Sequence, residues 1–159
     1  MRNKKTLSIL LGLILIIIAL ILIYSHFQPE YKKIGGRHYT IEIIKITGRE
    51  REEYFKPGIY YQYNFSNNYE DYINKNIDVE SILEELVNNN IPVQEAWFKN
   101  FSTACKPDEG EITLPAVVIP ALIVRLSNED PRIEQFGFIK TNNPDIGWCA
   151  LKVKHYIFH

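Results

Sequence analysis

The stretch "DVESILEELVNNN", residues 78–90, carries the clearest secondary-structure pattern in the C-terminal part of this 159-residue chain. Asp78 is a residue type that favours helix N-caps, and the Asn run before Pro92 is a helix stop signal. Between these ends, apolar residues at i, i+3, i+4, i+7 and i+8 form one stripe: Val79, Ile82, Leu83, Leu86 and Val87. The spacing predicts an amphipathic helix with one face packed on another element.

Segments with strand character lie on both sides of this helix. Upstream, 38–47 is rich in Ile and Thr, and 59–65 alternates between two faces. We expect these two strands to pair as a hairpin, and we expect a bulge between Ile43 and Ile44 that keeps Ile41 and Ile44 inward. Of the two faces of 59–65, the one with Ile59, Tyr61, Tyr63 and Phe65 is the predicted core face.

Downstream of the helix, four further segments are rich in β-branched and aromatic residues, which favour strands: 93–103, 111–126, 132–140 and 147–158. Pro115 and Pro120 predict that 112–126 is one bent or interrupted strand, buried on both faces, and not a membrane span. In the last segment, Cys149 falls on the core face. The order predicts an α+β domain in which one helix packs on a curved antiparallel sheet of the roll type.

A long apolar run precedes this domain. Leu7 to Tyr24 contains no charged residue, and eighteen helical residues extend about 27 Å, close to the thickness of a bilayer core. No small-residue cleavage site follows it, so we expect an uncleaved signal-anchor. The predicted organisation is a basic tail at 1–6, a transmembrane helix at 7–24, a linker at 25–37 with Gly35 and Gly36 as its pivot, and a domain at 38–159.

Charges on the two sides of the run predict its orientation. Arg2, Lys4 and Lys5 adjoin the run, whereas the basic residues after it start at Lys32 and are partly offset by Glu30. We therefore expect a single-pass protein of the cell membrane with a cytoplasmic N-terminus and an extracytoplasmic domain, for example in a periplasm. Residues 25–159 carry 15 Lys or Arg against 19 Asp or Glu, a net charge of −4, which argues against nucleic acid as a partner.

The chain has two cysteines, Cys105 and Cys149. Outside the cytoplasm such a pair usually oxidises, so we expect a disulfide between them; two separate buried thiols are the alternative if the orientation is reversed. Closing the loop between the two cysteines would add about 4 kcal/mol to the free energy of unfolding in the chain-entropy model.

Patterns for catalysis and metal binding are weak in this sequence. Cys105 lacks the flanking residues of a thiol nucleophile, although His38, His155 and His159 are available as bases. The spacing of the cysteines and histidines matches no common zinc site, and the acidic cluster Asp108, Glu109 and Glu111 is too short for a calcium loop. The sequence thus predicts no catalytic residue, no metal and no cofactor.

An aromatic-rich segment from Tyr54 to Tyr72 holds eight Tyr or Phe residues. Exposed tyrosines are favoured at interfaces, whereas a core or sheet-rim location is the plainer reading. If a partner-binding face exists, we expect it on the side away from the core, at Tyr60, Gln62, Asn64, Tyr69 and Tyr72.

These features predict a membrane-anchored, non-enzymatic protein whose outer domain binds a protein partner, either a component of an envelope complex or a toxin that it neutralises. The alternative is an envelope hydrolase that uses carboxylates or a Cys-His pair. A pocket lined by convergent polar groups would favour the hydrolase.

Overall fold

The structure is a computed structural model, and it describes residues 14, 16–18, 32–46, 55–73, 75–105, 114–147 and 150–159. The chain divides into two compact units, Met1–Glu30 and Tyr31–His159.

The first unit contains the predicted transmembrane run, most of which lies outside the described residues. Ile14 and the segment 16–18 are helical, and their side chains are 47–59% exposed. No helix among the described residues has both the length and the apolar character needed to cross a bilayer. The predicted tail, most of the span and the linker up to residue 31 fall outside the described part.

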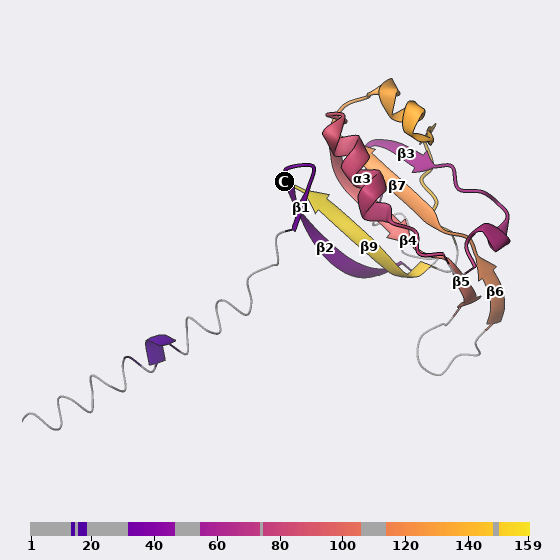
Figure 1. Cartoon of the computed structure of the whole chain (residues 1–159), viewed down its shortest axis with the longest axis horizontal. Coiled ribbons are helices and arrows are strands. Elements are labelled where there is room, and N and C mark those ends of the chain that lie inside the picture. The colour runs from indigo at the N-terminus through magenta and orange to yellow at the C-terminus, as the bar shows by residue number, and fades with distance from the viewer. Residues whose placement is uncertain are drawn as a thin grey trace, which may run out of the picture. The chain divides into compact units, whose positions relative to one another are not determined.

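The second unit is built on an antiparallel sheet of seven strands in the order β1-β2-β9-β4-β7-β3-β8 (Figure 1). A separate two-stranded sheet pairs β5 with β6. The strands are β1 Lys32–Ile34, β2 Arg37–Ile46, β3 Ile59–Tyr63, β4 Val93–Lys99, β5 Ser102–Cys105, β6 Leu114–Val118, β7 Ala121–Leu126, β8 Phe138–Thr141 and β9 Ala150–Phe158. Among the helical elements of this unit, α3 spans Val79–Asn88, and two 3-10 helices, η1 and η2, span Tyr69–Asp71 and Pro131–Phe136.

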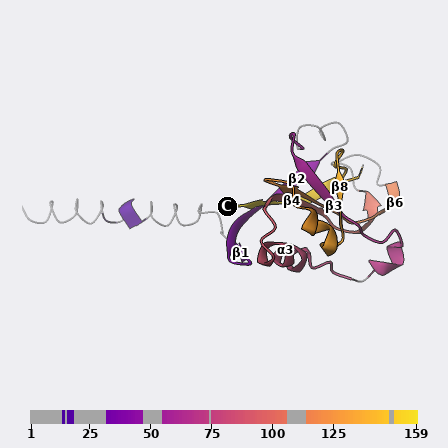
Figure 2. The same ribbon diagram turned by 90° about the horizontal axis from the view of Figure 1, so that it is seen from above.

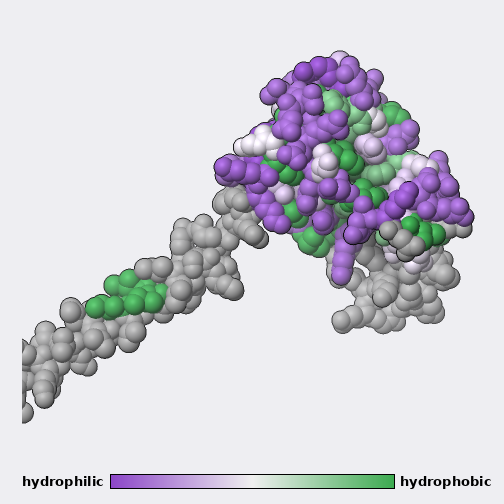
Figure 3. Space-filling model, in the orientation of Figure 1, coloured by the Kyte–Doolittle hydropathy of each residue, from purple (hydrophilic) through white to green (hydrophobic). Residues whose placement is uncertain are grey.

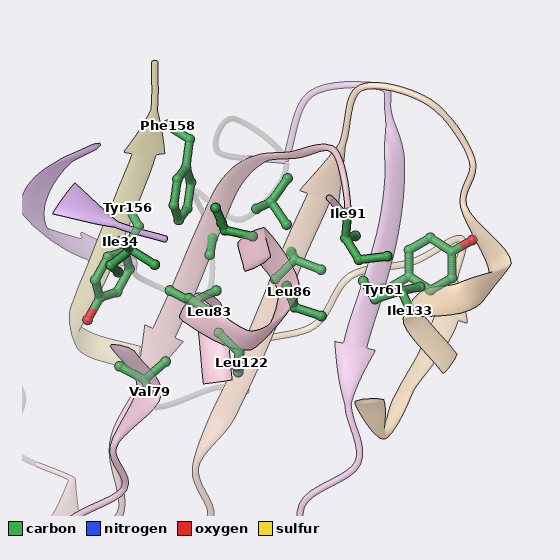
Figure 4. Close-up of a cluster of buried hydrophobic side chains, with 14 of the residues drawn as sticks. Ile34, Tyr61, Val79, Leu83, Leu86, Ile91, Leu122, Ile133, Tyr156 and Phe158 are labelled. Atoms are coloured by element: carbon green, nitrogen blue, oxygen red, sulfur yellow. The ribbon is translucent and has the colours of Figure 1, made fainter. Parts of the chain in front are cut away.

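The helix predicted at 78–90 is confirmed as α3. The Asp78 side chain accepts a hydrogen bond of 3.1 Å from the Ser81 backbone N–H, so Asp78 is the N-cap. The apolar stripe of α3 packs on the sheet, with Val79, Leu83, Leu86 and Val87 buried and Ile82 partly buried. Figure 4 shows Leu83 and Leu86 lying over Leu122 of β7.

Both faces of the sheet carry apolar clusters. Figure 2 shows α3 and η2 on one side of the sheet. The larger cluster joins residues of both helices to Val93, Ala96 and Phe98 of β4, so it lies on this face. The smaller cluster lies on the opposite face and contains Tyr60, Trp97, Ala121, Ile123, Ile146 and Val153, with Ile44 and Phe55 packed against it. The core of this unit therefore has two layers, one on each side of β4 and β7.

The predicted hairpin of 38–47 with 59–65 is wrong. β2 pairs with β1 and β9, whereas β3 pairs with β7 and β8. The bulge also lies elsewhere, because the β2 register shifts between Ile44 and Ile46. As a result Ile41 packs on the larger cluster and Ile44 on the smaller one, on opposite faces of the sheet.

Two other segments differ from the sequence-based expectation. The strand expected at 132–140 begins as η2, since Asp130 caps it, Pro131 starts it and Gly137 ends it with a φ of 83°. Gly35 and Gly36, expected as a linker pivot, have φ values of 53° and 83° and form the tight turn between β1 and β2. The sheet therefore extends into the predicted linker.

The interruption expected within 112–126 is confirmed. β6 and β7 flank Ile119 and Pro120 and belong to different sheets. The expected burial on both faces holds for β7, in which all residues except Arg125 are buried, but not for β6, in which Val117 is 53% exposed. The unit is thus an α+β domain made mostly of antiparallel sheet, and polar residues cover most of the α3 side of this domain in Figure 3.

Gly35 lies against the C-terminal end of α3, and this contact yields a stability prediction. A Cβ added at Gly35 would lie 2.6 Å from Asn88 Oδ1 and 2.7 Å from Val87 Cγ1, whereas one added at Gly36 meets nothing within 4 Å. Both residues have positive φ, so either alanine costs about 1 kcal/mol in the backbone. Overpacking adds about 1–3 kcal/mol at Gly35 alone.

We therefore expect Gly35→Ala to lower the free energy of unfolding by about 2–4 kcal/mol and Gly36→Ala by about 1 kcal/mol, measured by urea unfolding of the full chain. Gly36→Ala is the matched control for the backbone cost. Equal losses in the two variants would show that the turn does not pack on α3.

Candidate functional site

A cleft of about 410 Å³ lies on the face of the sheet opposite α3. Its residues come from β2, β3, β4, β7 and β9 and from the loop before β3: Glu42, Ile44, Lys56, Tyr60, Glu95, Trp97, Arg125 and His155. The cleft brings charged and aromatic side chains together on a sheet whose buried residues are otherwise largely apolar.

Strand register brings these side chains together. Glu42 of β2 lies opposite His155 of β9, and His155 lies opposite Trp97 of β4. In the next row, Glu95 of β4 lies opposite Arg125 of β7, which lies opposite Tyr60 of β3. Side chains directly opposite one another on one face of an antiparallel sheet are in contact range. Two cross-strand rows therefore form the cleft.

An irregularity in β4 directs Glu95 into the cleft. The β4–β7 register shifts between Val93, which pairs with Leu126, and Glu95, which pairs with Arg125. Residues two apart normally share a face of a strand, yet Val93 is in the α3-side cluster and Glu95 lines the cleft. One extra residue, Gln94, changes the alternation, as β-bulges do.

Glu95 is the centre of a charge network. One of its carboxylate oxygens, Oε1, accepts a hydrogen bond from Arg125 Nη2 in an ion pair, and the other, Oε2, lies 2.8 Å from His155 Nε2. The second ring nitrogen of His155, Nδ1, lies 3.8 Å from Glu42 Oε2. Side-chain exposure is 20% for Glu95, 22% for Arg125 and 14% for His155, against 60% for Glu42. The inner members are therefore weakly screened by solvent and Glu42 forms the rim.

Aromatic rings surround this network. The Trp97 indole stacks on the His155 imidazole with centroids 4.8 Å apart and planes 10° apart. Phe55 and Tyr60 contact Trp97 with centroid distances of 5.2 and 6.1 Å. The Tyr60 hydroxyl donates to the Lys56 carbonyl. Burial raises the pKa of Tyr60, Arg125 opposes this rise and Glu95 adds to it, so Tyr60 is a neutral donor at physiological pH.

Two donors in the cleft residues have no acceptor among the described atoms. They are Trp97 Nε1–H and Arg125 Nε–H, and both nitrogens are buried. Trp97 as a whole is 1% exposed. A buried donor without an acceptor costs about 1–3 kcal/mol.

The network has the composition of an acid–base site but not its geometry. Both oxygens of Glu95 are engaged, and both ring nitrogens of His155 face a carboxylate. A general base needs an unengaged lone pair aimed at a substrate proton. Over the described ranges there is also no group of three His, Cys, Asp or Glu side chains placed to hold a metal ion.

The predicted partner-binding residues differ in their exposure in the structure. Tyr60 and Gln62 are on the side away from α3, as expected, but Tyr60 is only 4% exposed. Tyr72 is 8% exposed and its hydroxyl donates to the Ser66 carbonyl, so the expected exposure of these two tyrosines is wrong. Asn64 is exposed, and the Tyr69 side chain lies outside the described part. Of the four whose side chains are described, Tyr60 alone lines the cleft.

The cysteine prediction falls outside the described residues. Cys105 ends β5, but only its backbone is described, and Cys149 directly precedes the described part of β9. The acidic cluster Asp108, Glu109 and Glu111 also lies outside. The disulfide therefore stays a prediction.

Sequence reasoning missed five of the eight described cleft residues: Glu42, Lys56, Glu95, Trp97 and Arg125. His155 was considered only as a base for Cys105. A signal was present for Arg125, which interrupts the strongly apolar strand "ALIVRL". Strand order was the missing information, because it decides which side chains of different strands become neighbours.

Comparison with known protein families, with curated protein sequences and with solved structures found no match to this chain.

The central place of Glu95 yields a prediction. We expect Glu95→Gln to lower the free energy of unfolding by about 1–3 kcal/mol, because a neutral amide leaves the half-buried Arg125 without its counter-charge. Glu42→Gln is the matched control, with an expected loss of about 0–0.5 kcal/mol for an exposed pair. Urea unfolding at neutral pH measures both. A loss of unfolding free energy from Glu42→Gln as large as that from Glu95→Gln would contradict the central role of Glu95 in the charge network.

Proposed function

We propose that this chain is a single-pass membrane protein whose domain lies outside the cytoplasm and binds a protein partner without catalysing a reaction. The cleft opposite α3 is the proposed binding site, and the partner is a component of an envelope complex or a toxin that the domain neutralises. The observation that carries this proposal is a cleft whose central carboxylate is already held on both oxygens.

The membrane part of the proposal rests on sequence. The apolar run Leu7 to Tyr24 has the length of a transmembrane helix, and the basic residues before it favour a cytoplasmic N-terminus. The finer architecture that we propose is this uncleaved anchor followed by a roll-like domain with one packed helix. An anchored binding domain keeps its partner near the membrane surface.

The binding part rests on the cleft. Its volume of about 410 Å³ falls within the range of about 300–1,000 Å³ typical of ligand sites. Aromatic rings and an arginine, the residue types enriched at binding hot spots, line it together. Cross-strand contacts hold these side chains in place, so little conformational entropy is lost on binding.

The alternative function is an envelope hydrolase. The Glu95–His155 contact of 2.8 Å favours it, because a carboxylate orients the imidazole in many hydrolases. The engagement of His155 Nε2 by Glu95 and the absence of a nucleophile among the described lining residues favour binding instead. For the Cys-His form, neither cysteine side chain lies in the described part.

Photo-crosslinking from the cleft rim tests the binding proposal. Benzoylphenylalanine in place of Glu42, whose side chain is 60% exposed, should give a specific protein adduct in native membranes, identified by mass spectrometry. Glu84, exposed on α3 on the other side of the sheet, is the matched control position and should not give that adduct. The same adduct from both positions, or no adduct from Glu42, would overturn the proposal.

Thiol labelling of intact cells tests the compartment and the disulfide together. We expect a membrane-impermeant maleimide to label the full chain only after reduction with a membrane-impermeant reductant such as a phosphine. Labelling without reductant would contradict the disulfide, and labelling only after lysis would contradict the orientation.

A further inference from the structure

We infer that Glu42 and His155 form a docking point at the rim of the cleft for a cationic side chain of the partner, a lysine or an arginine, and that a proton on His155 releases this side chain. The inference rests on the proposed binding function, and it names the chemistry and the pH dependence of that same site.

The hydrogen bond between His155 and Glu95 fixes the neutral form of the imidazole. Nε2 of His155 lies 2.8 Å from Glu95 Oε2, and an ionised carboxylate only accepts hydrogen bonds. Nε2 therefore carries the proton when His155 is neutral, because a neutral imidazole has one N–H donor and one acceptor nitrogen. The acceptor nitrogen is then Nδ1, which lies 3.8 Å from Glu42 Oε2. Two acceptors thus face each other, and no hydrogen bond joins them.

Both acceptors are open to a ligand. The Glu42 side chain is 60% exposed. Nδ1 of His155 has no hydrogen-bond partner among the described atoms, yet it is not one of the buried unpartnered atoms, which are Trp97 Nε1 and Arg125 Nε. Nδ1 therefore keeps solvent access. Since the two acceptors are 3.8 Å apart, one donor nitrogen of a ligand can lie within about 3 Å of both.

The surrounding charges favour a cation over a neutral donor at this point. Glu95 is compensated by Arg125 of β7, whereas no Lys or Arg side chain in the described part pairs with Glu42. The other cation of the lining, Lys56, belongs to the loop before β3, and three strands separate β3 from β2. Tyr60 of β3 is neutral. A cationic side chain therefore gains the uncompensated charge of Glu42 together with two acceptors.

Protonation of His155 removes the docking point. Histidine is the side chain whose charge ordinarily changes between about pH 8 and pH 5. A proton on Nδ1 converts this acceptor into a donor aimed at Glu42, so the imidazolium occupies the carboxylate and repels a second cation. Glu95 does not replace Glu42 as a docking group, because Arg125 holds one of its oxygens and His155 the other. Acid therefore releases the partner's cationic side chain.

Capped tripeptides test this chemistry on the full chain in lipid nanodiscs. The probes are alanine-lysine-alanine, acetylated and amidated at its ends, and a counterpart whose lysine carries an ε-acetyl group, which removes the charge. In NMR titrations at about pH 8, where His155 is expected to be neutral, the lysine peptide should bind about tenfold more tightly than its acetylated counterpart. At about pH 5.5 it should bind about tenfold more weakly than at pH 8, while the Nδ1 resonance of His155 reports the added proton.

Single substitutions separate the two acceptors from the rest of the cleft. Glu42→Gln removes the charge and should weaken binding of the lysine peptide about tenfold at neutral His155. His155→Gln keeps an N–H donor for Glu95 but cannot change its charge, so its affinity for the peptide should be equal at the two pH values. His159→Gln removes a histidine outside the described cleft lining and is the matched control, which should keep the pH effect of the parent chain. A dispersed amide spectrum verifies that each variant is folded.

Three results would each overturn the inference: equal affinities of the two peptides, equal affinities at the two pH values, or a pH effect that persists in His155→Gln. Benzoylphenylalanine in place of the exposed Lys56, which leaves Glu42 intact, distinguishes this inference from the proposed function. A protein adduct from Lys56 without lysine-peptide binding would leave the proposed function standing and reject the docking chemistry. Lysine-peptide binding with no protein adduct from Lys56 or Glu42 would uphold the docking chemistry and overturn the proposed function.

Discussion

The bulge in β4 is the constraint on which both sides of this domain depend. Before it, Val93 points into the cluster under α3; after it, Glu95 points to the opposite face and Ala96 and Phe98 return to the α3 side. If Gln94 were an ordinary residue of a regular strand, the period of two would place Val93 and Glu95 on one face. Either a carboxylate would enter the apolar core or a valine would leave it, and both are unfavourable.

The cleft follows from this change of alternation. Once Glu95 faces away from α3, β7 supplies Arg125 and β9 supplies His155 at the neighbouring positions of the sheet. The buried Trp97 then closes the space beneath them by stacking on His155. A polar site thus lies directly on an apolar cluster, where reduced solvent access strengthens each hydrogen bond and raises the cost of each donor left without an acceptor.

Elements that depend on local chemistry were predictable. α3 was correctly predicted because its stripe, its Asp78 cap and its Asn-Pro ending all lie within one short segment. The two faces of β3 were also predicted, with Tyr61 and Tyr63 toward α3. The hairpin between β2 and β3 was wrong because sequence neighbours are not always sheet neighbours. Tyr60 and Tyr72 were expected on the surface because alternation assigns a face but does not say what covers it.

By itself, the sequence determined the α+β class, the position of α3, the interruption before β7 and the apolar run near the N-terminus. Each of these features depends on the pattern of contiguous residues. Only the tertiary structure decided that Glu42, Glu95, Arg125 and His155 meet. These residues come from four strands, and the strand order and the β4 bulge that align them arise from long-range pairing, for which no short segment carries a signal.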